Sequence, residues 1–404
     1  MKIFAVGGSG AVGRGVLGLL APSDLVTQIA VVGRNLAHAE ETAAALGGKA
    51  NAVRADAGDE RELAHHMAGY DLVLNAATDE TVLPVLRAAI EAGAHYCDVN
   101  LVDEAMELTD KAEAAGIAAI IKNGIGPGLS SLMGVHVARQ LDEVRQLQRG
   151  IASLVDFDSL NELTSPQWLE DPEGARAALR EFGPFMTWLL QMTQENGTRT
   201  MLDHQDGRWV EVDPVRLGVD VPHGGGTGFS YPYVSLDSFW QALPTDLGDV
   251  APMEMWFSTL PPRADAVLRD HALPLRDGDV EPETAIGAFL DVVESDPQRW
   301  LTVPEDHVPI PIMWVRAVGQ KNGRPARCDC WVSAPLPKPA GWLLTNAALA
   351  AAALKILRGE VSERGVMAAE QAFDPPSFFE EMAGLLPEPP PHGQLVGESL
   401  HWLD

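Results

Sequence analysis

Three glycines near the start of the chain have the spacing Gly-x-Gly-x-x-Gly. In VGGSGAVGRG they follow a short apolar run and precede an Ala/Leu-rich segment. Without a Cβ, a glycine lets backbone amides at the start of a helix approach a diphosphate. Gly8 would turn the chain off the strand, Gly10 would let the backbone reach the phosphates, and Gly13 would let the helix pack closely. The pattern predicts a dinucleotide site at Gly8, Ser9, Gly10, Ala11, Val12 and Gly13.

The end of the second predicted strand indicates which dinucleotide would bind. NAD-binding proteins usually place an Asp or Glu there, which binds the adenosine ribose hydroxyls. This chain reads VVGRN, with Arg34 and Asn35 at that position and no carboxylate. A guanidinium can pair with a 2'-phosphate, which favours NADP(H), whereas Arg34 stacked on adenine would suit either cofactor.

Polar residues follow the later predicted strands. Ligands of parallel α/β sheets bind beyond the carboxyl ends of the strands, so these residues should surround the nicotinamide. We predict cofactor contacts from Asn75, Ala76 and Ala77, catalytic roles for Asp98 and Lys122, and a substrate contact from Asn100.

The roles of Asp98 and Lys122 have several interpretations. Either group could transfer a proton. Asp98 could instead hold a substrate ammonium group, and Lys122 could pair with a substrate carboxylate or with Asp98. Polar residues at strand ends also cap helices, so a structural role is an alternative for both.

Two further segments could contact substrate. The glycine-rich turn at 124–131 contains Gly126 and Ser130 at an expected helix start, where amides could bind a carboxylate or the nicotinamide carboxamide. A plain helix cap is the alternative. His223 and Tyr231 belong to a glycine-rich loop at 223–232 that could close over the site, or they could simply pack.

The first 128 residues alternate short β-rich apolar runs with Ala/Leu/Glu-rich stretches. This pattern predicts an α/β fold, with an N-terminal Rossmann domain built on a doubly wound parallel sheet. We expect strands at 3–6, 29–33, 52–55, 72–77, 96–99 and 118–123, and helices beginning near residues 13, 36, 60, 81 and 103.

Residues 129–340 should form a second, mixed α/β domain for substrate binding and dimerisation, with helical insertions. Strand patterns occur at 148–155, 209–212 and 312–318, helical patterns at 179–194 and 285–293, and a hairpin turn at Asn322 and Gly323. Residues 341–404 should return to the Rossmann domain as helices, beginning with an Ala-rich helix packed against a sheet. The proline-rich stretch at 387–391 favours a flexible or draped C-terminus.

Composition excludes several classes of function. The 404 residues carry a formal net charge of -28, which disfavours nucleic-acid and membrane partners. The three cysteines indicate no disulfide framework, and the C-x-C pair at Cys328 and Cys330 is explained by alternation in a strand. The N-terminus lacks the pattern of a signal peptide, so we expect a cytoplasmic protein. No metal-ligand pattern is present, and we predict no metal.

Several segments together resemble the saccharopine dehydrogenase (reductase-type) family of NAD(P)-dependent oxidoreductases. They are GGSGAVGRGVLGLLA, VVGRNLAHAEETAAALG, DLVLNAATDETVLPVLRAAIEAGAHYCDVN with its "AGxHYxD" pattern, and AAGIAAIIKNGIGPGLSSLMG. Near the end, GRPARC and GVMAAEQAFDP are similar to a strand and a terminal helix pair of the family. Most of the likeness lies in the first third of the chain.

The resemblance implies a Rossmann domain completed by C-terminal segments and a second α/β domain that binds substrate and often dimerises. It further implies NADP(H)-dependent hydride transfer to or from the C–N bond of a small, amino-acid-like imine or amine, with a homodimer as the assembly. Alternatives are a reductase of carbonyl or enoyl substrates, a non-catalytic NAD(P)-binding protein, or an enzyme that holds its cofactor for a redox-neutral reaction.

Overall fold

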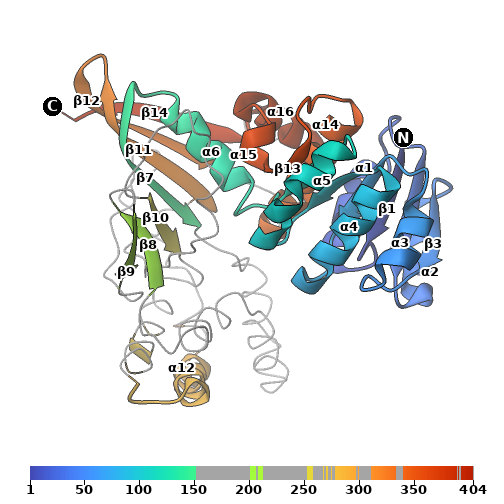
Figure 1. Cartoon of the computed structure of the whole chain (residues 1–404). Coiled ribbons are helices and arrows are strands. Elements are labelled where there is room, and N and C mark those ends of the chain that lie inside the picture. The colour runs from blue at the N-terminus through green and yellow to red at the C-terminus, as the bar shows by residue number, and fades with distance from the viewer. Residues whose placement is uncertain are drawn as a thin grey trace.

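The protein contains two seven-stranded sheets in the part of the chain that the structure describes (Figure 1). The structure is a computed structural model. It describes residues 1–151, 201–205, 208–212, 253–257, 278–296, 311–333, 340–388 and 393–403, with a few single positions between them. Of the sequence predictions, the helix at 179–194 and the loop at 223–232 lie outside these residues.

The first sheet is wholly parallel and has the strand order β13-β6-β5-β4-β1-β2-β3. The order reverses at β1, which confirms the predicted doubly wound Rossmann fold. Except for the edge strand β3, its strands are mostly buried apolar runs, as expected where helices cover both faces. They are β1 (Lys2–Val6), β2 (Gln28–Gly33), β3 (Ala50–Arg54), β4 (Leu72–Asn75), β5 (His95–Asp98), β6 (Ala118–Ile121) and β13 (Gly365–Ala368).

Helices connect the strands and begin near the positions that the sequence predicts. Side-chain caps start two of them: Asn35 Oδ1 accepts from His38 N at 3.4 Å, and Asp59 Oδ1 accepts from Glu62 N at 3.0 Å. The connecting helices are α1 (Ala11–Leu20), α2 (Leu36–Leu46), α3 (Glu60–Met67), η1 (Asp79–Thr81), α4 (Val82–Ala92), η2 (Asp103–Leu108) and α5 (Thr109–Ala114).

The second sheet is mixed and has the order β14-β12-β11-β7-β10-β8-β9, with only β10 and β7 parallel. α6 (Leu129–Ala138) packs on β7, β11 and β12. Asn322 and Gly323 both have positive φ and close the predicted hairpin. The strands are β7 (Glu143–Ile151), β8 (Met201–Gln205), β9 (Arg208–Val212), β10 (Met253–Phe257), β11 (Met313–Lys321), β12 (Arg324–Val332) and β14 (Val396–Trp402); α12 (Pro282–Ser295) lies apart from them.

The C-terminal region contributes to both sheets. β13 is the outer strand of the Rossmann sheet beside β6, and β14 pairs with β12 over seven residues. The prediction of a flexible or draped tail was therefore wrong for residues 396–402. VGESLHW has apolar residues at positions 396, 400 and 402, but Glu398 interrupts the alternation, so the local pattern was too weak to predict a strand and its conformation depends on pairing with β12.

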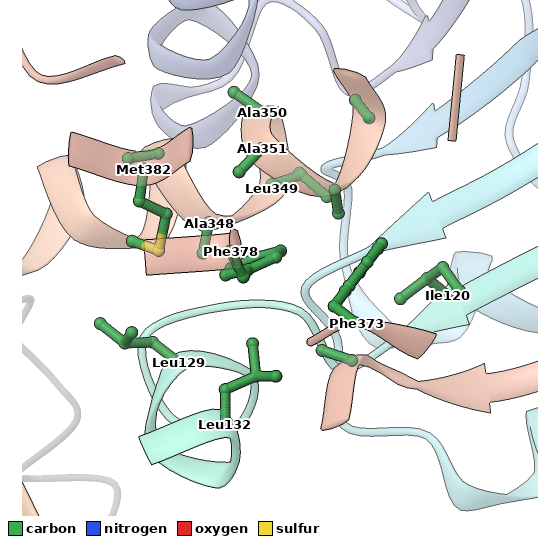
Figure 2. Close-up of a cluster of buried hydrophobic side chains, with 14 of the residues drawn as sticks. Ile120, Leu129, Leu132, Ala348, Leu349, Ala350, Ala351, Phe373, Phe378 and Met382 are labelled. Atoms are coloured by element: carbon green, nitrogen blue, oxygen red, sulfur yellow. The ribbon is translucent and has the colours of Figure 1, made fainter. Parts of the chain in front are cut away.

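α14 (Ala340–Leu357) is the Ala-rich helix that the sequence predicts to pack against a sheet. Residues 347–353 are completely buried, and the small side chains allow close approach. α14 contacts α1, β4, β5 and α16 (Pro375–Leu385). Figure 2 shows its alanines among side chains of β6, α6 and α16, with Phe373 beside α15 (Ala369–Ala372). Among the described residues no helix has the length and apolarity needed to cross a membrane.

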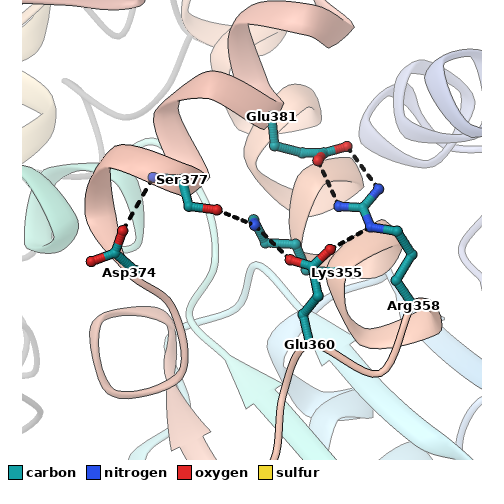
Figure 3. A network of polar contacts seen from close by, with 6 residues as sticks. All are labelled: Lys355, Arg358, Glu360, Asp374, Ser377 and Glu381. Atoms are coloured by element: carbon teal, nitrogen blue, oxygen red, sulfur yellow. Dashed lines mark hydrogen bonds and ion pairs between the residues drawn. The ribbon is translucent and has the colours of Figure 1, made fainter.

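Ion pairs fix the carboxyl end of α14 to α16 (Figure 3). Lys355 is 5% exposed, and its ammonium donates to Glu360 Oε2 at 2.8 Å and Ser377 Oγ at 2.7 Å. Arg358 donates through both Nη atoms to the carboxylate of Glu381. These paired charges hold the two helices in one relative position.

We expect Ala350→Leu to lower stability by about 1–3 kcal/mol, because extra methylene groups in a filled core force its neighbours apart. Urea unfolding followed by circular dichroism measures the change. The matched control is Ala37→Leu on the exposed face of α2, which adds the same side chain and should leave the urea midpoint nearly unchanged. Equal midpoints for the two variants would contradict the close packing around α14.

Candidate cofactor and active site

The glycine turn brings three backbone segments into contact. Gly7 N donates to Val32 O at 3.1 Å, Gly8 N to Ala5 O at 3.2 Å, and Gly10 N to Gly7 O at 2.9 Å. A Cβ on Gly13 would lie 2.7 Å from Gly8 Cα and even closer to Gly7 O, so only glycine permits this contact. α1 begins directly at this turn without a side-chain cap, which leaves amides at its start for an anionic ligand.

Gly7 also requires glycine, which the motif did not indicate. Its φ is 70°, and a Cβ there would lie 2.7 Å from Ala77 N. Ala76 N donates to Val6 O at 2.9 Å, so the loop after β4 lies against the turn after β1. Ala76 and Ala77 are therefore adjacent to the predicted cofactor residues, as expected for the switch point between β1 and β4.

Two arginines occur near the glycine turn. Arg14 Nη1 donates to Ser9 O at 2.9 Å from the first turn of α1. Ser9 Oγ lies 3.4 Å from the position that a Cβ on Gly33 would occupy, and Arg34 follows Gly33 with an exposed side chain. Asn35 Oδ1 caps α2. Arg14 was not predicted as a cofactor contact, although its position directly after Gly13 could have indicated one.

The predicted strand-end residues of β4 and β5 are joined in one buried network. Asn75 Nδ2 donates to Tyr96 Oη at 3.2 Å, and Asn75 Oδ1 accepts from Ala77 N at 3.1 Å. Tyr96 Oη donates to Asp98 Oδ2 at 2.7 Å. Tyr96 was missed because it precedes the strand end, and its hydroxyl links two polar residues that sequence reasoning treated separately.

Asp98 is completely buried and organises the ends of β5 and β6. Its Oδ1 accepts from Lys122 N at 3.0 Å and from Asn100 N at 3.2 Å. Burial raises the pKa of the Asp98 carboxyl to about 7, although these hydrogen bonds act in the opposite direction. Asn100 Nδ2 also donates to Ala77 O at 3.2 Å, so this side chain ties the two strand ends together.

Lys122 adopts a left-handed backbone conformation with φ of 57°, which is uncommon for a residue with a Cβ. Its backbone amide contacts Asp98, and its ammonium forms an ion pair with Asp103 at the start of η2. The Lys122 side chain is 5% exposed and that of Asp103 is 40% exposed. The ammonium is therefore buried, whereas the carboxylate that pairs with it is partly exposed.

A second group of buried polar residues, from α6, β7 and α15, interacts electrostatically with Lys122. Ser130 Oγ at the start of α6 accepts from Arg149 Nη1 on β7 at 2.9 Å, and both residues are buried. Burial raises the pKa of the Glu370 carboxyl to about 7, while Arg149 and Lys122 lower it. Sequence reasoning missed Arg149 and Glu370 because their proximity depends on how the two sheets meet.

Carbonyl groups of the loop at 124–128 accept hydrogen bonds from two backbone amides at the start of α6. Leu129 N donates to Gly124 O at 2.9 Å and Ser130 N donates to Ile125 O at 3.0 Å. These two amides are therefore occupied by the chain itself. Gly126 belongs to this loop, and its peptide bond with Pro127 is cis. The other substrate candidates, His223 and Tyr231, lie outside the described residues.

A pocket of about 460 Å³ lies elsewhere, between α14 and α16. Thr345 of α14 lies near the candidate site, because its Cγ2 is 3.7 Å from the position that a Cβ on Gly124 would occupy. Lys355, which lines the pocket, is ten residues further along α14, and ten helical residues span about 15 Å. The pocket is therefore distant from the candidate site. Lys355 and Arg358 pair with carboxylates of the chain itself (Figure 3). We assign no ligand to this pocket.

Comparison with known proteins agrees with this geometry. Residues 3–120 match the model of the saccharopine dehydrogenase NADP binding domain. A curated relative, carboxyaminopropylagmatine dehydrogenase from Synechocystis sp., is 25% identical over 262 residues. The match spans 60% of this chain and 60% of that relative's length.

Two solved structures share the fold across almost the whole chain. Apo saccharopine dehydrogenase (L-Glu forming) from Saccharomyces cerevisiae has a TM-score of 0.64 at 15% identity, covering 99% of both chains. Homospermidine synthase from Legionella pneumophila, in complex with NAD, has a TM-score of 0.56 at 12% identity, covering 99% of this chain and 91% of that one. At such low identity the likeness concerns the fold. Residues 3–120 thus match the saccharopine dehydrogenase NADP binding domain, and over almost the whole chain the fold is similar to that of saccharopine dehydrogenase.

Proposed function

We propose that the protein is an NADP(H)-dependent oxidoreductase that transfers a hydride to or from the C–N bond of a small imine or amine. The observation that carries this proposal is the glycine turn at the carboxyl edge of a parallel sheet, adjacent to buried ionisable groups. A bound nicotinamide would supply the hydride, and the residues of this chain would position the substrate and move a proton.

The glycine turn fits a dinucleotide because, without side chains, its backbone amides can come close to the phosphates. Gly8, Gly10 and Gly13 would let the turn and the start of α1 face the diphosphate. Arg14, which contacts Ser9, and Arg34, which follows Gly33, would pair with the adenosine 2'-phosphate. No acidic residue occurs in the first turn of α1, so nothing there repels phosphate.

The choice of a C–N substrate is supported by the names of the similar proteins. Carboxyaminopropylagmatine dehydrogenase and homospermidine synthase are both named for amine compounds, and saccharopine dehydrogenase is described as L-Glu forming. An amino-acid-like substrate carries both ammonium and carboxylate groups, and the region around Lys122 offers both signs of charge.

We assign proton transfer to Lys122 and a positioning role to Asp98. Both Asp98 oxygens already accept hydrogen bonds from the chain, so this carboxyl sets the backbone of Lys122 rather than touching substrate. The Lys122 ammonium is buried beside the partly exposed Asp103 carboxylate, and a substrate nitrogen that replaced this carboxylate would exchange a proton with it. Ser130 and Arg149 would form the part of the site contributed by the second sheet.

The cofactor turn is tested by a matched pair of glycine substitutions within α1. Gly13→Ala should abolish NADPH binding because its Cβ would overlap the turn, whereas a Cβ on Gly18 meets nothing within 4 Å. Gly18→Ala should bind NADPH like the wild type. Fluorescence titration with NADPH measures both. Wild-type protein that binds neither NADPH nor NADH would refute the proposed function.

The C–N chemistry is tested by NADPH oxidation with pairs of amines and carbonyl compounds. We expect turnover to require both members of a pair, and we expect Lys122→Met to lower kcat by about 10²-fold or more, the usual contribution of a general acid–base group. Protein that binds NADPH but reduces ketones or enoyl compounds without an amine would instead be a carbonyl or enoyl reductase.

The cofactor preference is tested by removing the arginines. Arg34→Ala and Arg14→Ala should each weaken NADPH binding by about tenfold or more and change NADH binding little, since a hydrogen bond between charged groups contributes roughly 1.5–3 kcal/mol. Arg61→Ala, on the exposed face of α3, is the control. Parallel titration with 2',5'-ADP and 5'-ADP isolates the 2'-phosphate. If the ratio of NADPH affinity to NADH affinity is unchanged in both variants, the arginines do not bind the 2'-phosphate.

The buried Asp98 carboxyl predicts how stability depends on pH. Its pKa rises from 3.8 to about 7 on folding, so the native state keeps a proton that the unfolded chain releases between these values. The stabilising contribution is complete below about pH 4 and is lost as the pH rises through about 7. Three pKa units correspond to at most about 4 kcal/mol.

Asp98→Asn should therefore reduce the decline in Tm between about pH 4 and about pH 8. Thermal unfolding across this range measures the effect, with Asp110→Asn on α5 as an exposed control. If Asp98→Asn and the wild type lose stability in parallel over the whole range, the burial of a proton on Asp98 is ruled out.

A further inference from the structure

Trp342 is an exposed aromatic residue at the start of a helix that is buried along most of its length. From Ala347 to Leu357 every residue of α14 is at most 5% exposed, whereas Trp342 is 50% exposed. A single exposed apolar side chain is common on protein surfaces, so its meaning depends on where it lies.

α14 begins at the edge of the parallel sheet where a dinucleotide is expected. Its carboxyl end leads into β13, which runs parallel to β6, so α14 starts at the carboxyl edge of the sheet and ends at the opposite edge. Two contacts agree with this direction: the Asn346 side chain lies against Gly15 of α1, and Thr345 Cγ2 lies near Gly124 beyond β6. α14 and α1 therefore lie side by side with their first turns at the same edge (Figure 1).

Trp342 belongs to the stripe of α14 that faces α1 and the sheet. Residues three, four and seven apart share one face of a helix, so Trp342 is in line with Thr345, Asn346 and Leu349. Asn346 contacts α1, Thr345 contacts the turn at Gly124, and Leu349 is completely buried. Helical side chains lean toward the helix N-terminus. The indole therefore lies about one turn, or ~5 Å, beyond Asn346 in the direction of the carboxyl edge.

The strand order indicates which half of a dinucleotide would meet Trp342. Arg34, the predicted contact of the adenosine half, follows β2 on one side of β1. α14 contacts β4 and β5, which lie on the other side of β1. A dinucleotide bound at the switch point between β1 and β4 would extend its nicotinamide half toward β4 and β5.

We propose that the Trp342 indole packs against the nicotinamide ring of the bound cofactor. This inference rests on the proposed NADP(H)-dependent function and adds a cofactor contact from α14, outside the glycine motif. The indole offers a flat apolar face on which a planar ring can stack, and binding would remove that face from water. The first turn of α14 has no acidic residue that would repel the cofactor phosphates.

The first test compares a whole cofactor with its adenosine half. Trp342→Ala should weaken NADPH binding by about tenfold, the usual effect of losing aromatic stacking on a base. It should leave 2',5'-ADP binding unchanged, because this probe has no nicotinamide. Trp342→Phe retains a ring and should bind NADPH within about threefold of the wild type. Trp402→Ala removes another exposed tryptophan, on β14, and should bind both ligands like the wild type. Titration calorimetry measures all of these affinities.

Energy transfer provides a second readout. Tryptophan emission overlaps the absorption of the reduced nicotinamide, so an indole in contact with that ring loses its emission when NADPH binds. NADPH should therefore quench less tryptophan fluorescence in Trp342→Phe than in the wild type, although both are saturated. The chain has ten tryptophans, and Trp402→Phe is the control that removes one of them without changing the quenched share.

The outcomes separate this inference from the proposed function. If Trp342→Ala keeps its Tm and binds NADPH as tightly as the wild type, or loses NADPH and 2',5'-ADP affinity equally, the contact with nicotinamide is wrong. It is also wrong if only the KM for the substrate rises, because the indole would then meet the substrate. Wild-type protein that binds neither NADPH nor NADH would contradict the proposed function itself.

Discussion

The close approach of α1 to the turn after β1 is the constraint on which the rest of the structure depends. Gly13 packs against the backbone of Gly7 and Gly8, where no Cβ fits. On its other side α1 contacts α14, with Gly15 beneath the side chain of Asn346. Asn123 Nδ2, beyond β6, donates to Ala348 O on the same helix at 2.8 Å. α14 thus relates the predicted cofactor turn to the strand end that carries Lys122.

Buried polar groups fix the other half of the candidate site. A buried donor or acceptor without a partner costs about 1–3 kcal/mol, so a complete set of partners strongly restricts the possible backbone arrangements. Asn75, Tyr96 and Asp98 satisfy one another and the amides of three loops. The same network buries a carboxyl whose pKa lies near neutrality. Rigidity and sensitivity to protonation therefore arise from one group of contacts.

Local signals explain which parts of the fold were predictable. The glycine turn, the apolar parallel strands, the hairpin at Asn322 and the Ala-rich helix each have a pattern within a few residues, and each is present. β14 has no such pattern because its conformation comes from pairing with β12, far away in the sequence. For the same reason the sequence showed Asp98 as polar at a strand end but could not show that its oxygens are occupied.

The site residues beyond the Rossmann domain depend on contacts between distant segments. Ser130 was a candidate because it follows a glycine-rich turn, but its partner Arg149 lies on a strand whose sequence, EVRQLQRGI, shows no difference between its arginines. Only the packing of α6 on β7 distinguishes buried Arg149 from exposed Arg145. Residue type alone could not identify Arg149, because only the tertiary structure shows which of the two arginines is buried.

The same arrangement links the candidate site to the connection between the two sheets. The chain passes from β6 through the 124–128 loop and α6 into β7, and Lys122, Ser130 and Arg149 all lie along this passage. Glu370, which follows β13, interacts with the charges of Arg149 and Lys122, and both of them lower its pKa. A change in the angle between the sheets would therefore alter the spacing of these charged groups before it altered either sheet. Site chemistry and domain geometry are coupled because the same few residues serve both.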